Sequence, residues 1–315
     1  MDILPNQQFK DDIKSFFKYN PAFESQTEFN LFLEIFAKQL NDSAEFGLSS
    51  SDEVFPDITI EGCGEEFHSS ICIFLQKSNI AIKNINWYKE VNKLFPNVKT
   101  LLKANFSKNK IVSVSIYYQS PIEPNTLNLI LKKRDALMPD VNSLWDCMKI
   151  LERKILFIGI DLPKEELPAI QPYLLVPPEK GLSQKLEQCA KKITGTAYPL
   201  EKWHNLLTLN NDIFVSFSIK NKLTNRIKID YEKVPVTSAY DIAKDINIDR
   251  NIFANLVEIA ENFDIKTLSF LGIKLTEDIK LKYYIKRSYF ALNDEKELLA
   301  RFLERTAGRF APGIK

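Results

Sequence analysis

Two short segments in the second half of the chain alternate polar side chains with apolar ones. They are residues 226–232, RIKIDYE, and residues 280–286, KLKYYIK. A period of two is typical of β-strands, in which successive side chains point to opposite faces. One face of these two strands then carries Arg226, Lys228, Asp230, Lys280, Lys282 and Tyr284.

These residue types are suited to binding a diphosphate. A guanidinium offers a planar fork of donors, an ammonium is a point charge, and a tyrosine adds a hydroxyl on an aromatic ring. If they face an enclosed interior, the reduced dielectric strengthens each contact. For any single lysine, a solvated surface position is the alternative.

Three other segments predicted to be strands show the same period. In 111–118, Tyr117 shares a face with Ser113 and Ser115, and in 213–219 Phe214 shares a face with two serines. In 44–50, Glu45 stands opposite the apolar Ala44 and Phe46. A polar face of this kind can meet either water or a common interior.

Composition excludes several classes of function. The chain has 315 residues, with 42 Lys and Arg against 41 Asp and Glu, so no global field directs it to nucleic acid or to a membrane. Its four cysteines lack CxxC spacing and it has two histidines, which argues against a structural zinc site. Without a secretory leader or a long apolar run, we expect a cytoplasmic protein with reduced thiols.

The elements that must position these residues follow a repeat of two strands and a helix. Adjacent strand pairs favour antiparallel pairing, whereas a parallel barrel would have a helix after each strand. The predicted order is helix Gln7–Leu40, hairpin Ala44–Ser50 with Ser70–Lys77, helix Trp87–Ala104, hairpin Ile111–Tyr118 with Leu127–Lys133, helix Val141–Leu151, hairpin Ile155–Asp161 with Ile170–Val176, helix Leu182–Ile193, hairpin Ile213–Ile219 with Arg226–Tyr231, helix Ala239–Asn262, hairpin Thr267–Ile273 with Ile279–Ile285, and helix Glu295–Arg305.

The repeat predicts an α+β fold with about ten antiparallel strands closed into one barrel and surrounded by helices. The helices cover the apolar strand faces from outside, and the polar faces line the interior. We expect one domain, residues 1–315, because a single repeat cannot bury its own apolar face.

With this repeat, the sequence resembles the ABBA, or prenyltransferase-barrel, aromatic prenyltransferases. The stretch TNRIKIDYEKVP resembles the strand of the antibiotic-pathway and naphthalene-diol enzymes that carries a diphosphate-binding arginine, here Arg226. The stretch TEDIKLKYYIKRSY resembles their last strand, whose basic residue falls on Lys280 and whose tyrosine falls on Tyr284. In AIQPYLL, their Asn-x-Tyr pattern corresponds to Gln171 and Tyr173.

The sequence departs from the family pattern in two places. A lysine of the family's third strand falls on Ser113, and we expect Lys132 to replace it from the neighbouring strand. No aspartate lies in Ser70–Lys77, where some members hold magnesium through a carboxylate. We therefore expect no required cofactor or metal, although magnesium can stimulate by pairing with the substrate.

The resemblance implies transfer of a dimethylallyl or longer prenyl group from an allylic diphosphate to an electron-rich aromatic molecule. Basic side chains would stabilise the departing diphosphate, aromatic rings would shield the carbocation, and a carboxylate would orient the acceptor. The diphosphate residues are Arg226, Lys228, Lys280, Lys282, Lys132 and Gln171, the shield residues are Tyr117, Tyr173, Phe214 and Tyr284, and the carboxylates are Glu45 and Asp230. For Asp230, a structural ion pair with Arg226 or Lys228 is the alternative role.

Two other functions fit the same pattern. One is a peptide prenyltransferase of the cyanobactin type, and the other is a non-catalytic barrel that binds a lipid or an anionic metabolite. The partners expected are an allylic diphosphate and a small aromatic acceptor, with no nucleic acid and no membrane, and we expect a monomer.

Overall fold

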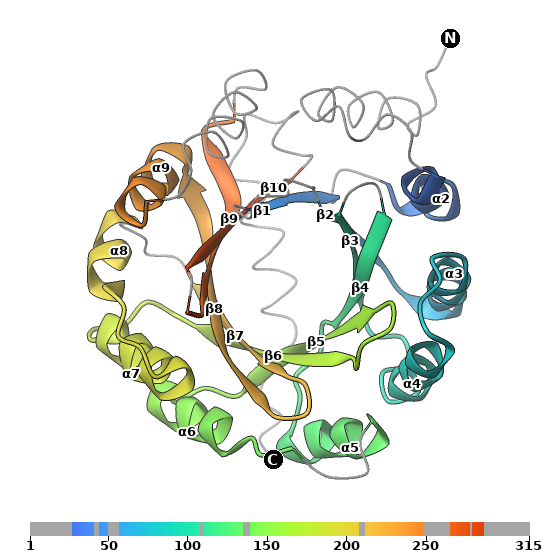
Figure 1. The fold of residues 1–315 in the computed structure, drawn as a ribbon, viewed down its shortest axis with the longest axis horizontal. Coiled ribbons are helices and arrows are strands. Elements are labelled where there is room, and N and C mark those ends of the chain that lie inside the picture. The colour runs from blue at the N-terminus through green and yellow to red at the C-terminus, as the bar shows by residue number, and fades with distance from the viewer. Residues whose placement is uncertain are drawn as a thin grey trace, which may run out of the picture.

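The chain forms a closed barrel of ten antiparallel strands, with helices around its outside (Figure 1). The computed structural model describes residues 27–40, 44–49, 57–107, 110–134, 139–207, 212–247, 265–277 and 279–286. Each strand pairs with its neighbours in sequence, and β1 pairs with β10 to close the barrel. The predicted fold is therefore confirmed.

The strands arrive as consecutive hairpins. They are β1 (Glu45–Ser49), β2 (Asp57–Gly62), β3 (Thr100–Ser107), β4 (Lys110–Tyr118), β5 (Ile155–Pro163), β6 (Ala169–Val176), β7 (Ile213–Ile219), β8 (Leu223–Pro235), β9 (Thr267–Leu275) and β10 (Lys280–Lys286). The helices in the described residues are α2 (Thr27–Ile35), α3 (Gly64–Lys77), α4 (Ile82–Asn92), α5 (Pro124–Arg134), α6 (Asn142–Leu151), α7 (Leu182–Thr194), α8 (Leu200–Leu207) and α9 (Val236–Asp245), with a short 3-10 helix at Ala37–Gln39.

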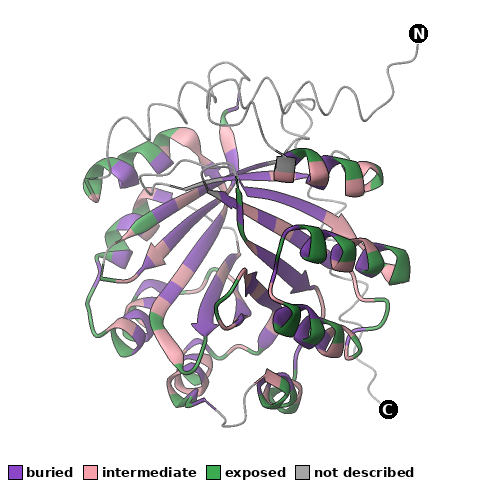
Figure 2. Cartoon of the chain, turned by 45° about the vertical axis from the view of Figure 1, so that its right-hand side comes forward, coloured by how far each residue is buried: buried purple, intermediate pink, exposed green. Residues whose placement is uncertain are grey.

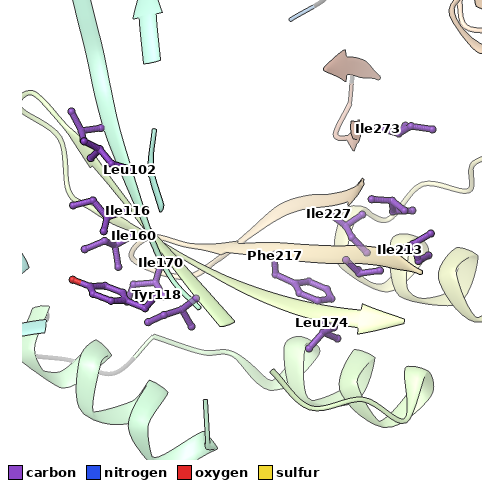
Figure 3. Packing of buried hydrophobic residues seen from close by; sticks show 14 of the residues in the cluster. Leu102, Ile116, Tyr118, Ile160, Ile170, Leu174, Ile213, Phe217, Ile227 and Ile273 are labelled. Atoms are coloured by element: carbon purple, nitrogen blue, oxygen red, sulfur yellow. The ribbon is translucent and has the colours of Figure 1, made fainter. Parts of the chain in front are cut away.

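The hydrophobic core lies between the barrel and the helices. Outward-facing strand residues such as Phe217, Ile227 and Ile273 are buried, and they form one continuous cluster with the inner faces of the helices (Figure 3). The helices are buried on the side toward the barrel and exposed on the other side (Figure 2). Burial of each such side chain contributes about 1.5–3 kcal/mol, so the outer strand face holds the fold together.

Helix α7 shows how the sequence produces this layer. Its buried residues include Leu182, Leu186 and Ile193, whose spacing places them on one side of a helix. The helix ends at Gly195, which adopts a φ of 78° that favours glycine. The apolar stripe thus covers the barrel while the lysines of the helix stay in water.

The third, fourth and fifth predicted hairpins are confirmed as β5–β6, β7–β8 and β9–β10. The predicted helices near 141–151 and 182–193 are α6 and α7, and the start of the predicted helix 239–262 lies in α9. The remainder of that helix, most of Gln7–Leu40, and Glu295–Arg305 lie outside the described residues. The one-domain prediction, which includes those segments, stays a prediction.

The first two predicted hairpins were wrong in their second strands. Residues 70–77 belong to α3, where Phe67, Ile71 and Phe74 are buried at helical spacing. The β-branched residues of that run suggest a strand locally, but packing against the barrel favours the helix. The true partner of β1 is β2.

The second hairpin is β3 with β4. Residues 127–133, predicted as a strand, lie in α5, where Leu127, Ile130 and Leu131 form the buried side of a helix. The predicted helix 87–104 divides into α4 and the start of β3. No helix among the described segments is long and apolar enough to cross a membrane.

Candidate active site

The inward-facing side chains change character along the barrel. The hairpin turns lie at one end, called the hairpin end, and the connections to the helices lie at the other, called the helix end. Strand alternation and register place polar residues on the inner face toward the hairpin end and aromatic residues toward the helix end on β4, β5, β7, β9 and β10. The interior, called the lumen below, thus has a charged zone and an aromatic zone.

Three lysines face one another in the charged zone. Lys274 of β9 stands directly opposite Lys228 of β8 on one side and Lys280 of β10 on the other. Burial, together with the charges of Arg226, Lys280 and Lys228, lowers the pKa of Lys274 to about 8, and Asp161 opposes that shift. Like charges in direct opposition are unfavourable, so this row favours binding of an anion.

The charged zone holds four neighbouring cations, the three lysines and Arg226. Arg226, Lys274 and Lys280 form no ion pair with a carboxylate in the described part of the chain. Lys228 differs, because its ammonium lies 2.6 Å from a carboxylate oxygen of Asp230. That carboxylate is buried, as the predicted structural ion pair requires. Burial lowers the pKa of Lys228, and Asp230 opposes that shift.

Lys228 also donates a hydrogen bond of 2.8 Å to the Tyr284 hydroxyl, although β9 lies between their strands. Gly272 of β9 makes this possible. A Cβ atom at Gly272 would lie 2.5 Å from Asp230 Oδ1 and 2.7 Å from Lys228 Cε. The missing side chain therefore leaves the space that Lys228 and Asp230 occupy.

Asp57, the first residue of β2, is a second buried carboxylate of the lumen. It forms an ion pair with Lys282 of β10, and its Oδ2 lies 3.9 Å from Lys103 Nζ of β3. Lys282 reaches it across Gly47 of β1, where an added Cβ would meet Lys282 Cε at 3.1 Å. Burial lowers the pKa of Lys282 to about 8, and Glu45 opposes that shift.

A polar network continues from Asp57 along β3, β4 and β5. In the amide orientation that satisfies both of its ends, Asn105 donates to Asp57 at 3.0 Å and accepts from the Ser113 hydroxyl at 2.9 Å. Ser115 donates to Asp161 at 2.9 Å. These contacts keep the buried Asp57 and the half-buried Asp161 hydrogen-bonded, as charges removed from water require.

Six rings form a continuous series of contacts in the lumen, called the aromatic belt below. Its members are Tyr117, Tyr173, Phe157, Phe214, Phe270 and Tyr284, whose successive ring centroids lie 5.8, 4.5, 5.9, 5.9 and 6.3 Å apart. Tyr117 lies over Gly159, where a Cβ would meet its ring at 2.7 Å. Burial raises the pKa of Tyr117, Tyr173 and Tyr284, so their hydroxyls stay protonated.

Two predicted residues lie next to this belt and at the closure of the barrel. Gln171 of β6 accepts a hydrogen bond of 3.1 Å from the Tyr173 hydroxyl. Glu45, at the start of β1, accepts one of 2.6 Å from Ser269. Both side chains are half-buried.

The structure brings eleven of the twelve predicted site residues to the inner face of the barrel. The exception is Lys132, which is exposed on α5. Its predicted inward position was wrong because residues 127–133 are helical, so Lys132 lies in the outer layer. Lys103 of β3 supplies the lumenal ammonium expected on that side of the barrel.

Several lumenal residues escaped the sequence analysis. Lys274 and Phe270 share one parity in β9, so alternation within that strand was the available signal. Asp57 and Lys103 lie in β2 and β3, which were not predicted as strands. Asp161 and Phe157 share a parity in β5.

The carboxylates of the lumen are not grouped as metal ligands. Within the residues that the structure describes, no group of three or more His, Cys, Asp or Glu side chains has the arrangement of a metal site. Asp57 is instead engaged by Lys282, Lys103 and the amide of Asn105. Metal independence stays a prediction.

The barrel is the fold of the ABBA prenyltransferases. The chain superposes on 5-dimethylallyltryptophan synthase from Streptomyces coelicolor with a TM-score of 0.65 and 9% identity, over 91% of this chain and 99% of that one. It also superposes on PriB in a binary complex with product diphosphate, with a TM-score of 0.65 and 10% identity, over 91% of this chain and 97% of PriB.

A third solved structure shares the fold. AnaPT from Neosartorya fischeri gives a TM-score of 0.59 and 8% identity, over 90% of this chain and 98% of AnaPT. No protein-family model and no curated protein sequence matches the chain. At such low identities the comparisons establish the fold, and the chemistry must be inferred from the residues of the lumen.

Proposed function

We propose that the protein is an aromatic prenyltransferase, which transfers a dimethylallyl or longer prenyl group from an allylic diphosphate to an electron-rich aromatic molecule. The observation that carries the proposal is the in-register row of Lys228, Lys274 and Lys280 beside an aromatic belt. The row suits a polyanion, and the belt suits an allylic cation. Few other reactions need both within one enclosed space.

The reaction begins when the allylic C–O bond breaks and its electron pair leaves with the diphosphate. Arg226, Lys274 and Lys280 stabilise the charge that develops on the leaving group, and none of them forms an ion pair with a carboxylate of the described residues. Because these groups are held by the barrel before substrate arrives, little reorganisation is needed. Lys228 and Lys282 lie on the same strands, β8 and β10, and add to the positive field.

The allylic cation must then react with the acceptor before it reacts with water. The rings of Tyr117, Tyr173 and Phe214 lie in the belt and can shield it by cation–π attraction, with Phe157 stacked on Tyr173. Attack by the aromatic ring forms the new bond, and loss of a proton restores aromaticity. Glu45 is the proposed acceptor-side carboxylate, since it is half-buried on the inner face of β1 and accepts a hydrogen bond from the Ser269 hydroxyl.

The ligands of structural neighbours support this substrate pair. PriB has been described in a ternary complex with L-tryptophan and dimethylallyl thiolodiphosphate. The 6-dimethylallyltryptophan synthase from Micromonospora olivasterospora has been described with DMASPP and Trp. We therefore propose a small aromatic acceptor, and include indoles beside the phenols that the antibiotic-pathway resemblance favours.

We further propose that the enzyme requires no metal and acts as a cytoplasmic monomer. The balanced charge of the chain supports the absence of nucleic-acid and membrane partners. A cyanobactin-type peptide prenyltransferase on the same fold, and a non-catalytic barrel, are the alternatives that the first experiment must separate.

That experiment measures turnover of dimethylallyl diphosphate with phenols, indoles, phenazines and short peptides. We expect transfer to a small aromatic molecule. Arg226→Ala and Lys280→Ala should each remove about 1.5–3 kcal/mol of binding, which is roughly 10- to 150-fold. The exposed Lys132→Ala is the matched control and should behave as wild type. Diphosphate binding without turnover of any acceptor would instead favour the non-catalytic barrel.

A further inference from the structure

A row of charged side chains crosses the seam where the first and last strands pair. From β8 to β3, acidic and basic groups alternate around a single tyrosine. The seam row comprises Asp230, Lys228, Tyr284, Lys282, Asp57 and Lys103. In Figure 1 it spans the part of the barrel that contains β8, β9, β10, β1, β2 and β3.

Two glycines allow the row to cross intervening strands. Gly272 of β9 leaves room for Lys228 to reach Tyr284, and Gly47 of β1 leaves room for Lys282 to reach Asp57. A Cβ at Gly47 would also lie 3.2 Å from the Tyr284 ring. The ring of Tyr284 therefore lies over Gly47 of β1, and Lys228 reaches the Tyr284 hydroxyl across Gly272 of β9.

Lysines contact both the hydroxyl and the ring of Tyr284. Its hydroxyl accepts a 2.8 Å hydrogen bond from Lys228. Its ring centroid lies 4.8 Å from Lys228 Nζ and 5.6 Å from Lys282 Nζ. The side chain is 8% exposed, so little water screens these contacts.

We propose that Tyr284 is a positioning residue, which fixes the ammonium groups of Lys228 and Lys282 for diphosphate binding and does not shield the carbocation. The inference rests on the proposed function and reassigns the role that the sequence resemblance gave to this tyrosine. A ring that already attracts two ammonium groups would bring a third cation close to like charges. That repulsion opposes the gain from the ring face.

Other members of the aromatic belt are better placed to shield the cation. Among the described residues, no lysine lies over the ring of Tyr173 or Phe214, whereas Lys103 lies 5.6 Å from the Tyr117 centroid. Tyr173 is hydrogen-bonded to Gln171, a neutral group. The two roles thus fall on different strands, with Tyr284 on β10 and Tyr173 and Phe214 on β6 and β7.

Inorganic diphosphate separates the two roles because it has no allylic group to shield. Calorimetric titration of the full chain with inorganic diphosphate measures positioning alone. Tyr284→Phe keeps the ring and removes the acceptor of the Lys228 hydrogen bond. We expect about tenfold weaker binding for this variant, since a charge-assisted hydrogen bond is lost. Tyr173→Leu should bind inorganic diphosphate as wild type does.

Single-turnover transfer with both substrates saturating provides the second readout. We expect Tyr173→Leu to lose about tenfold or more and Tyr284→Phe to lose clearly less, since cation–π attraction and shielding from water act only in this step. The matched control is Tyr231→Phe, which removes a hydroxyl from the outer face of β8. It should leave both measurements unchanged.

Unchanged diphosphate binding by Tyr284→Phe would overturn the inference. So would slowed transfer by Tyr284→Leu without slowed transfer by Tyr284→Phe, because that pattern is expected of a residue whose ring shields the cation. The proposed function fails by a different result, namely the absence of prenyl transfer by the wild-type chain. Because diphosphate binding is measured without turnover, the inference can be tested under either outcome.

Discussion

At the scale of single residues, the lumen concentrates positive charge that the carboxylates among the described residues do not fully pair. Lys274 stands between Lys228 and Lys280, and Arg226 contributes to the same field. Such an arrangement costs stability in the free protein and is relieved when a polyanion binds. The residues of the proposed active site therefore act against folding and in favour of ligand binding.

This charge makes diphosphate binding depend on pH. The pKa values of Lys274 and Lys282 are lowered to about 8 in the free protein. Below pH 8 both ammonium groups are present and binding is strongest. Above it, each lysine must take up a proton to bind the anion, so affinity should fall with rising pH by as much as about tenfold per pH unit per lysine.

Calorimetry in buffers of different ionisation enthalpy checks this by counting the protons taken up at pH 9. Lys274→Met should weaken binding at pH 7 and make its pH dependence shallower. Affinity that stays constant from pH 7 to pH 9.5, with no proton uptake, would contradict the proposed role of these lysines.

Glu45 provides a test on the acceptor side. Glu45→Gln keeps the shape of the side chain and removes its charge. We expect it to slow prenyl transfer by about 10²-fold or more, within the range of general base catalysis, while binding of a non-ionisable diphosphate analogue stays near wild type. Transfer at the wild-type rate would remove Glu45 from the mechanism, and loss of analogue binding would assign it to the diphosphate.

At the scale of elements, glycines within strands decide which side chains can meet. Long side chains of one neighbouring strand lie over each glycine, from β8 over Gly272 and from β10 over Gly47. A strand glycine costs stability, but here it makes room for contacts that span three strands, namely the hydrogen bond from Lys228 to Tyr284 and the ion pair of Lys282 with Asp57. The strands thereby contribute to the site through the volume that they leave open.

Gly272→Ala tests this directly. The new Cβ would come within 2.5 Å of Asp230 Oδ1 and 2.7 Å of Lys228 Cε, so both side chains must move. We expect about tenfold weaker binding of inorganic diphosphate, comparable to the loss of one charge-assisted contact. Gly195→Ala is the control, because its Cβ would meet nothing within 4 Å although its φ of 78° strains the backbone.

The control should lose about 1 kcal/mol of stability and keep its affinity for diphosphate. The two variants therefore separate a local effect on the lumen from a general effect on folding. Equal affinities of Gly272→Ala and wild type would show that the crossing of Lys228 over β9 is not required for binding.

At the scale of the whole molecule, the two faces of the barrel have separate tasks. The outer face packs against the helices and holds the fold, and the inner face holds the charges. Phe217→Ala on the outer face of β7 should cost about 3–5 kcal/mol, as a large buried ring is lost. Chemical denaturation measures this loss, and a cost under about 1 kcal/mol would contradict the assignment of the core.

The inner face should respond in the opposite direction. Lys274→Met removes a half-buried charge whose pKa in the folded protein, about 8, lies below its ordinary value of 10.5. The free-energy cost of this charge to the folded state is complete below pH 8. It falls as the pH rises toward 10.5, the ordinary pKa of the lysine. We therefore expect the variant to raise the apparent Tm at pH 7 by about 2–5 °C and by less at pH 9.5. A lower Tm at pH 7 would show that Lys274 stabilises the free fold.

Chelation is the remaining test of the whole enzyme. We expect prenyl transfer to survive EDTA, because several lumenal cations can neutralise the diphosphate and Asp57 is engaged by Lys282 and Lys103. Added magnesium should stimulate modestly by pairing with the substrate. Loss of all turnover on chelation, restored by magnesium, would contradict metal independence.

The sequence by itself determined the repeat, the barrel and the parity of the strongest strands. Alternation in the sequences of β8 and β10 is enough to place Arg226, Lys228 and Tyr284 on one face. It failed for α3 and α5, since short apolar runs fit a strand as well as a buried helix. That local ambiguity put Lys132 on the wrong side of the barrel wall.

Only the tertiary structure decided which residues meet. Strand register set Lys274 between two other lysines, and closure of β1 on β10 brought Lys282 to Asp57, a residue more than two hundred positions earlier in the chain. Neither contact leaves a local signal, because side-chain alternation specifies a face but not the neighbour across it. The pairing of distant strands therefore created the charged row around Tyr284 from residues whose types alone were visible in the sequence.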